Sequence, residues 1–272
     1  MFHTSTLKQI SLLSYLLAAA LAVSSWGGIF LARTYAKETP YWAAQGMGQD
    51  AVNLIFVVPL LLVSSFFAAR GLKIFFFFLA GIFIYSIYSY LLYGFCVHFN
   101  GFFFVYCAGL GFSFYGLLLL TGEFPADKVK SWFNPSASTL LPAVFFMALT
   151  AVFYLLWLSE DIPAVLSGTP PNSLAEAGLF TNPVHLLDLS IVLPAMFIAS
   201  IQLWRKKPFG YLFFPAMMVF SIVMGVAIVG MMLAMNRQGI GGDSGPVGFF
   251  GLTILLSVGV LGNFLKSMGH SR

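Results

Sequence analysis

Long apolar runs alternate with short polar segments along the whole chain. Eight of these runs approach the roughly 20 residues that a helix needs to cross the hydrocarbon of a bilayer. They cover about residues 12–31, 51–69, 74–95, 102–120, 139–158, 184–204, 211–235 and 247–265. Charged residues, prolines and glycine clusters separate the runs, and these residues tend to end helices. The pattern predicts an all-α fold, a polytopic transmembrane helical bundle of about eight spans.

The amino-acid composition indicates a membrane protein. Sixty per cent of the residues are hydrophobic and 8% are charged, whereas soluble domains carry roughly a quarter charged residues. The 272 residues suffice for one compact membrane domain and leave too little loop for a separate soluble one. The net charge of +4 is distributed over short connections and forms no continuous stripe, so we expect a lipid bilayer as the partner and no nucleic acid.

The first run resembles a signal peptide because Lys8 precedes it. It is long for the apolar region of such a peptide, and no convincing small-residue cleavage site follows. We therefore predict that it is a span.

Lysine and arginine counts predict the orientation. With a cytoplasmic amino terminus, the outer side holds only Arg33, Lys37 and Arg237. The cytoplasmic side then holds ten: Lys8, Arg70, Lys73, Lys128, Lys130, Arg205, Lys206, Lys207, Lys266 and Arg272. This bias follows the positive-inside rule with both termini cytoplasmic and an even number of spans.

An internal repeat is indicated when the sequence is shifted by 135 residues. The shift aligns the second run with the sixth and places Asn53 on Asp188. Identical pairs are Leu54 with Leu189, Val57 with Val192, Pro59 with Pro194, Ser65 with Ser200 and Arg70 with Arg205. Two halves, residues 1–136 and 137–272, would each hold four spans, and an even number per half makes the repeat parallel.

Polar residues inside or at the edge of spans are the candidates for ligand binding, because an ionisable group in hydrocarbon is costly unless it is paired or hydrated. Asp188 lies about one turn inside the sixth run, and His185 lies on the same helix face. Gln49, Asp50 and Asn53 bring three polar groups to the start of the second run.

The predicted topology puts these groups at the extracytoplasmic ends of their spans, together with His98 and Asn182. The third run adds a hydroxyl-bearing stripe of Ser86, Ser89, Tyr90 and Tyr93 at helical spacing. We therefore expect a polar pocket walled by spans two, three and six, with Asp188, His185 and Asp50 at its centre.

Other interpretations apply to the same residues. Asp50 and Asn182 each suit the cap of a helix start, and Asp188 could form only an interhelical hydrogen bond. His98 could be an ordinary interfacial loop residue. Pro59 and Pro194 could splay two helices open, or could be prolines of the kind that membrane helices tolerate.

The absence of several known sequence motifs narrows the range of possible functions. The chain has no Walker loop, HExxH, GxSxG or dinucleotide-binding fingerprint. No cofactor is implied and no metal site is predicted, since His98 and His185 belong to no ligand motif. Cys96 and Cys107 are expected to be buried thiols, with a hairpin disulfide as the alternative in an oxidising compartment. The glycine-rich segment 239–245 is expected to be a flexible loop.

The Gly48-Gln49-Asp50 segment, the tyrosine-rich third run and the segment NPVHLLDL, residues 182–189, carry a resemblance. The chain resembles multi-pass proteins of bacterial inner membranes with no assigned activity. The resemblance implies that location, and it implies neither an activity nor a site.

Three functions are compatible with these residues. The first is binding or transport of a small or lipid-like ligand reached from the outer side. The second is a membrane-embedded enzyme that uses His185 as general base and Asp188 to orient it. The third is a non-catalytic subunit of a homo-oligomer or of a complex with another membrane protein, whose polar residues join helices.

Overall fold

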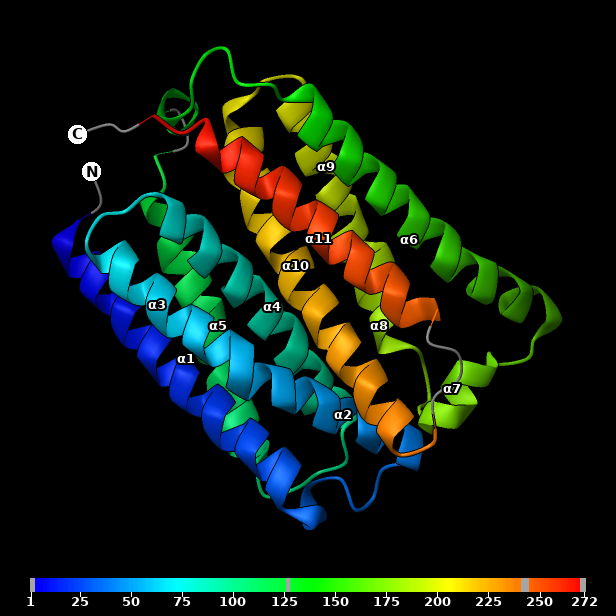
Figure 1. Ribbon diagram of the computed structural model, residues 1–272. Coiled ribbons are helices and arrows are strands. Elements are labelled where there is room, and N and C mark those ends of the chain that lie inside the picture. Colours follow the sequence, from blue (N-terminus) through cyan, green and yellow to red (C-terminus); the bar gives the residue numbers. More distant parts are fainter. Residues whose placement is uncertain (1–2, 126–127, 241–244, 270–272) are drawn as a thin grey trace. The chain divides into compact units, whose positions relative to one another are not determined.

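The computed structural model describes residues 3–125, 128–240 and 245–269, and every regular element in these ranges is a helix (Figure 1). The α-helices are α1 Thr4–Phe30, α2 Pro40–Val52, α3 Val58–Ala69, α4 Ile74–Cys96, α5 Phe103–Glu123, α6 Leu140–Ser167, α7 Asn172–Ala177, α8 Pro183–Leu187, α9 Leu193–Trp204, α10 Pro208–Arg237 and α11 Gly245–Lys266. Two π-helical segments, η2 Asn53–Val57 and η4 Asp188–Val192, join α2 to α3 and α8 to α9. Short 3₁₀ turns cover η1 Ala32–Thr34 and η3 Val129–Trp132.

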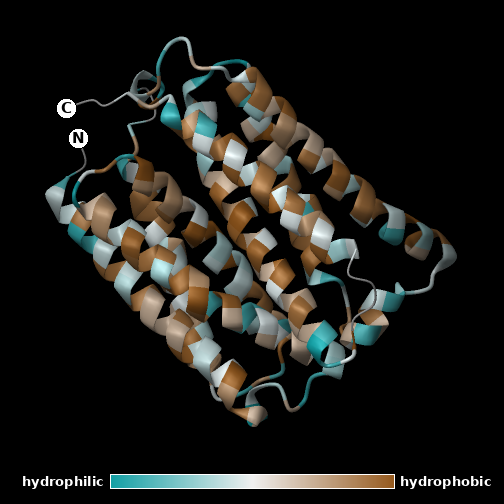
Figure 2. Cartoon of the chain, in the orientation of Figure 1, coloured by the Kyte–Doolittle hydropathy of each residue, from teal (hydrophilic) through white to brown (hydrophobic). Residues whose placement is uncertain are grey.

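Eight of the described helices are long and apolar enough to cross a membrane, which confirms the predicted number of spans. Two of them are composite, Pro40–Ala69 and Pro183–Trp204, because each continues through its π-helical segment. Figure 2 shows hydrophobic residues along the long helices and hydrophilic residues concentrated near helix ends and connections. Many apolar side chains are exposed, including Leu155 (70%) and Phe104 (80%), as expected of surfaces that contact lipid.

The second span begins earlier than the apolar run predicts. Pro40 occupies the first helical position, and the Thr39 hydroxyl caps the helix by accepting from the backbone N–H of Trp42 at 3.2 Å. Proline and threonine at these positions are favourable for a helix start. The interpretation of Asp50 as a cap is therefore wrong, because Asp50 lies ten residues inside the helix, about 15 Å from its start.

Both π-helical segments end beside a proline. The backbone N–H of Val58 donates to the carbonyl of Asn53, and the N–H of Leu193 donates to that of Asp188, each five residues back. Pro59 and Pro194 follow directly, and a proline has no N–H to continue the α-helical pattern. Proline and π-bulges are recognised causes of helix irregularity. The two segments begin 135 residues apart, at Asn53 and Asp188, which is the offset of the predicted repeat.

The chain divides into two compact units, which are described separately. The first unit comprises Met1–Phe124 and Val219–Ser257, and the second comprises Pro125–Met218 and Val258–Arg272. This grouping by packing differs from the predicted halves 1–136 and 137–272, and the repeat itself stays a prediction. In the first unit α1 packs against α2, α3 and α5, and α4 packs against α3 and α5.

In the second unit α6 packs against α9. An aromatic cluster forms part of its core: Phe133 stacks on Phe264 at 4.8 Å between ring centroids, and Phe214 meets both Phe146 and Phe264 edge-on. Such pairs stabilise cores through area buried and ring geometry.

Two expectations fall partly outside the described residues. The predicted glycine loop 239–245 is described only for residues 239, 240 and 245, and Arg272 of the charge count is not described.

Cys96 and Cys107 are free thiols, Cys96 half-buried and Cys107 exposed.

Candidate functional site

A buried carboxylate, Asp50, is the centre of a polar network inside the first unit. Its side chain is almost fully enclosed, with the residue 1% exposed. The Tyr35 hydroxyl donates to Asp50 Oδ2 at 2.6 Å, and the Tyr93 hydroxyl donates to Oδ1 at 2.9 Å. Gly28 of α1 makes room for the carboxylate, since a Cβ there would lie 1.7 Å from Asp50 Oδ2. Asp50 therefore sits where α2, α1 and α4 meet.

The network stabilises Asp50 with neutral donors. Among the described residues no lysine, arginine or histidine lies within ion-pair distance of Asp50, and Ser25 adds a third hydroxyl interaction. Burial raises the pKa of Tyr35 well above its usual 10.0, and the charge of Asp50 raises it further. Tyr35 thus stays protonated at physiological pH and keeps donating. Hydrogen bonds of this kind offset part of the cost of burying a carboxylate.

The other polar residues of the second span extend the network. Gln49 Nε2 donates to the Ser89 hydroxyl at 2.9 Å, and Asn53 Nδ2 donates to the Ser25 hydroxyl at 3.2 Å. The Tyr85 hydroxyl donates to Asn53 Oδ1 at 2.8 Å. All five of these side chains are buried.

The hydroxyl stripe of the third span faces this interior. Tyr90 is 1% exposed, its hydroxyl lies 3.4 Å from that of Ser24, and its ring occupies the space left by Gly109. Tyr93 stacks on Tyr106 with ring centroids 5.4 Å apart and planes inclined by 17°. The side chains of this stripe are packed and hydrogen-bonded among helices.

A second polar cluster belongs to the second unit and surrounds His185, which is 5% exposed. Its Nδ1 lies 2.9 Å from Asp161 Oδ1, and its Nε2 lies 3.9 Å from Glu160 Oε2. The Trp157 ring packs on the imidazole at 4.2 Å between centroids. Asn182 Oδ1 accepts from the backbone N–H of His185 at 3.1 Å, which confirms Asn182 as the cap of α8.

The carboxylate that the structure shows against the His185 ring comes from another helix, and the expected pairing of His185 with Asp188 stays a prediction. Asp161 on the preceding span binds the ring, while Asp188 Oδ2 accepts from the indole Nε1 of Trp157 at 2.9 Å. The intrahelical spacing predicted His185 and Asp188 on one face, and helix packing also brings Asp161 of α6 to the imidazole. Trp157 therefore connects Asp188 to His185 through a hydrogen bond on one side and ring packing on the other.

An open groove of about 600 Å³ lies beside this cluster. Asp161, Asn182 and His185 supply its ionisable and amide groups. Apolar side chains form much of the remaining wall, including Val165 (80% exposed), Phe180 (105%) and Leu186 (61%). Grooves of this size accommodate small organic ligands.

The predicted site residues thus fall into separate groups. Asp50, Asn53, Gln49 and Tyr93 share one network in the first unit, with the Tyr90 ring beside that of Tyr93, and His185, Asn182 and Asp188 form a cluster in the second. His98 lies in the turn between α4 and α5, where its Nδ1 is 3.1 Å from the Glu38 carboxylate. The single pocket walled by spans two, three and six stays a prediction.

Sequence reasoning missed several members of these groups. Tyr35 and Ser25 carried no signal, because a lone loop tyrosine and a serine in an apolar run are common. Asp161 falls just beyond the predicted fifth run, 139–158, and Trp157 lies at its end, so neither position indicated a contact with His185.

In the part of the chain that the structure describes, no three histidine, cysteine, aspartate or glutamate side chains are grouped as a metal site requires.

Comparisons with protein-family models, with curated proteins and with solved structures found no match to this chain.

Proposed function

We propose that this protein is a multi-pass protein of a bacterial-type inner membrane that binds an amphiphilic ligand in the groove beside His185. The observation that carries the proposal is the composition of that groove, where the His185–Asp161 pair adjoins exposed apolar side chains. An apolar wall next to a polar anchor matches a molecule with a hydrocarbon part and a polar head.

The polar anchor favours a head group that donates hydrogen bonds or carries positive charge. Asp161 and His185 are the ionisable residues of the groove wall, and Glu160 lies close to the imidazole. Both carboxylate side chains keep partial exposure, 26% for Asp161 and 33% for Glu160. A hydroxyl- or amine-bearing amphiphile fits this acceptor-rich end.

Exposed apolar residues beside the acidic groups also support a ligand at the membrane surface. Val165 and Leu166, at the end of α6, are 80% and 81% exposed and lie about one helical turn after the acidic pair Glu160 and Asp161. Covering a large apolar side chain stabilises by about 1.5–3 kcal/mol. Lipid or an amphiphilic ligand would supply that cover.

The proposed orientation places this groove on the extracytoplasmic side. It rests on ten lysine and arginine residues on one side of the predicted topology against three on the other. The proposed parallel repeat is supported by the 135-residue spacing of the two π-helical segments and of Pro59 and Pro194. Asp50 and His185 then occupy equivalent positions of the two halves.

Ligand retention tests the binding proposal. Wild-type protein, Asp161→Asn and the control Glu176→Gln would be purified in a mild detergent, and copurified small molecules and lipids identified by mass spectrometry. Glu176 is an exposed acidic residue of α7 outside the groove wall. We expect one amphiphile to be enriched in the wild type and the control and depleted about tenfold in Asp161→Asn, because a charge-assisted hydrogen bond is lost. Identical lipid profiles in all three would overturn the proposal.

The His185–Asp161 pair makes catalysis the second candidate function. A histidine oriented by a carboxylate beside an open groove is an arrangement suited to a general base. An enzyme would convert the copurified amphiphile on incubation, and His185→Gln would abolish conversion while binding persists. A purely structural role predicts instead that His185→Gln lowers the yield of folded protein first.

A further inference from the structure

A second, smaller pocket lies in the first unit, at the connection between α1 and α2. Its volume is about 200 Å³. One wall is the connection itself, with Arg33, Thr34 and Lys37, and the other is the turn between α4 and α5. Residues of that turn on the pocket wall are His98, Phe99, Asn100, Gly101 and Phe102.

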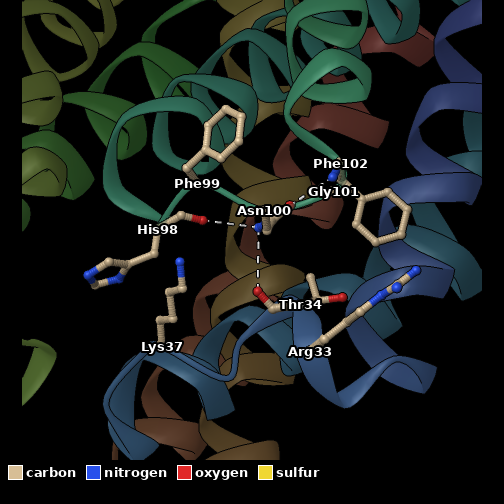
Figure 3. Close-up of a pocket in the computed structure, with 8 residues that line it drawn as sticks. All are labelled: Arg33, Thr34, Lys37, His98, Phe99, Asn100, Gly101 and Phe102. Atoms are coloured by element: carbon tan, nitrogen blue, oxygen red, sulfur yellow. Dashed lines mark hydrogen bonds between the residues drawn. The ribbon is translucent and has the colours of Figure 1, made fainter.

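Two cationic side chains line this pocket. Arg33 and Lys37 are both exposed, and in the described part of the chain neither is ion-paired with a carboxylate. Figure 3 shows them extending from the α1–α2 connection to either side of Asn100. The charge that faces the pocket is therefore available to a ligand.

The acidic residue that follows Lys37 in the chain is directed elsewhere. The Glu38 side chain is 2% exposed, and its carboxylate accepts from the backbone N–H of His98 at 2.7 Å. The His98 ring nitrogen Nδ1 lies 3.1 Å from both carboxylate oxygens. Glu38 is thus engaged by His98, and the pair fixes the turn against the connection.

Asn100 holds the two walls of the pocket together. Its Nδ2 donates to the backbone carbonyls of Thr34 (3.4 Å) and His98 (3.3 Å), and its Oδ1 accepts from the N–H of Phe102 at 2.9 Å. The Thr34 hydroxyl donates in turn to the carbonyl of Gly27 at 2.7 Å. The cations therefore extend from a backbone that is already ordered, which lowers the entropic cost of binding.

The position of these cations is unusual for the proposed orientation. Only three lysine or arginine residues fall on the outer side, and two of them, Arg33 and Lys37, line this pocket. Basic residues are depleted on that side of membrane proteins. Their concentration in one pocket indicates a binding role.

We propose that this pocket binds a phosphate group through Arg33 and Lys37. Arginine matches phosphate oxygens with a planar pair of donors, and lysine adds a second positive charge. The group could be free phosphate or the head of an anionic phospholipid, since Phe99 on the pocket wall is 72% exposed and can contact acyl chains. This proposal is independent of the amphiphile groove in the second unit.

The test uses the full chain in phosphatidylcholine nanodiscs, as wild type, as Arg33→Gln/Lys37→Gln and as the control Arg237→Gln. Arg237 is the third outer basic residue in the predicted topology, and it lies outside this pocket. Calorimetry would measure binding of inorganic phosphate. Native mass spectrometry would measure retention of phosphatidylglycerol from mixed nanodiscs.

We expect the double variant to bind one or both probes at least about tenfold more weakly than the wild type, with the control unchanged. Binding of phosphate alone identifies a free anion, and retention of phosphatidylglycerol alone identifies a lipid head group. Equal binding by all three proteins, or equal loss in Arg237→Gln, overturns the proposal. Because both replaced side chains are exposed, thermal unfolding should be unchanged, and an altered unfolding temperature would direct the comparison to single variants.

Discussion

At the residue scale, the arrangement around Asp50 shows how a carboxylate can be buried in a membrane helix with no cationic partner among the described residues. Tyr35, Tyr93 and Ser25 surround it with hydroxyl groups. Gly28 leaves the space that the carboxylate occupies. Each hydroxyl is a neutral donor, and removing one donor leaves a buried acceptor less well satisfied.

Tyr35→Phe removes one of these donors and should lower the free energy of unfolding by about 1–3 kcal/mol. Thermal unfolding in detergent would measure the change. Tyr115→Phe is the matched control, because Tyr115 is 59% exposed and should change stability little. Equal effects of the two substitutions would contradict the role given to Tyr35.

The same residue predicts a pH dependence. The pKa of Tyr35 is raised above its unfolded value of 10.0, so the folded state holds this proton after the unfolded state has begun to lose it. The contribution of Tyr35 to stability is therefore complete below about pH 10 and declines as pH rises toward its folded pKa. Above pH 10 the wild type should lose stability more steeply than Tyr35→Phe, measured as the pH dependence of the unfolding temperature. Parallel curves would exclude this linkage.

At the scale of elements, close helix contacts depend on glycine. A Cβ on Gly48 of α2 would lie 2.4 Å from the backbone oxygen of Gly230 in α10, and a Cβ on Gly230 would lie 2.4 Å from Val52 Cγ2. Both residues belong to the first unit. Small residues let backbones approach in this way in membrane bundles. The contact lies near Asp50, so the helix that carries the carboxylate is positioned by backbone packing.

Gly48→Ala should destabilise the protein by about 1–3 kcal/mol, because neither backbone can move without disturbing its neighbours. Gly94→Ala is the control, since Gly94 lies in α4 with nothing within 4 Å of an added Cβ. That substitution should be neutral or slightly stabilising, in line with the higher helix propensity of alanine. Thermal unfolding of both variants would measure the difference, and a neutral Gly48→Ala would contradict the close contact.

The observed helices also show where the pattern of apolar residues predicts the bounds of a span correctly and where it does not. The runs predicted eight spans, and the helices that contain them are the ones observed. The run beginning at residue 51 missed the first part of the second span, because Gln49 and Asp50 are polar and lower local hydropathy. They are helical nevertheless, since Ser89, Tyr35 and Tyr93 satisfy them from other segments.

At the scale of the whole molecule, the proposed topology predicts which connections between helices face the outside of the cell and which face the cytoplasm. In a cysteine-free background with Cys96 and Cys107 replaced by alanine, Thr169→Cys should react with a membrane-impermeant maleimide in intact cells. Lys207→Cys should react only after permeabilisation, because the proposed topology puts residue 207 on the other side of the membrane from residue 169. Both positions are exposed, so access to the reagent is limited only by the membrane. The reverse pattern would invert the proposed orientation and place the His185 groove on the cytoplasmic side.

The sequence by itself determined the class of protein and the number of spans. These follow from local physics, because a chain in lipid must satisfy its backbone hydrogen bonds within each segment and keep its charges at the ends. Only the tertiary structure decided which side chains meet. His185 meets Asp161 and Asp50 meets Tyr35 because helix packing brings separate segments together, and spacing along one helix carries no information about its neighbours.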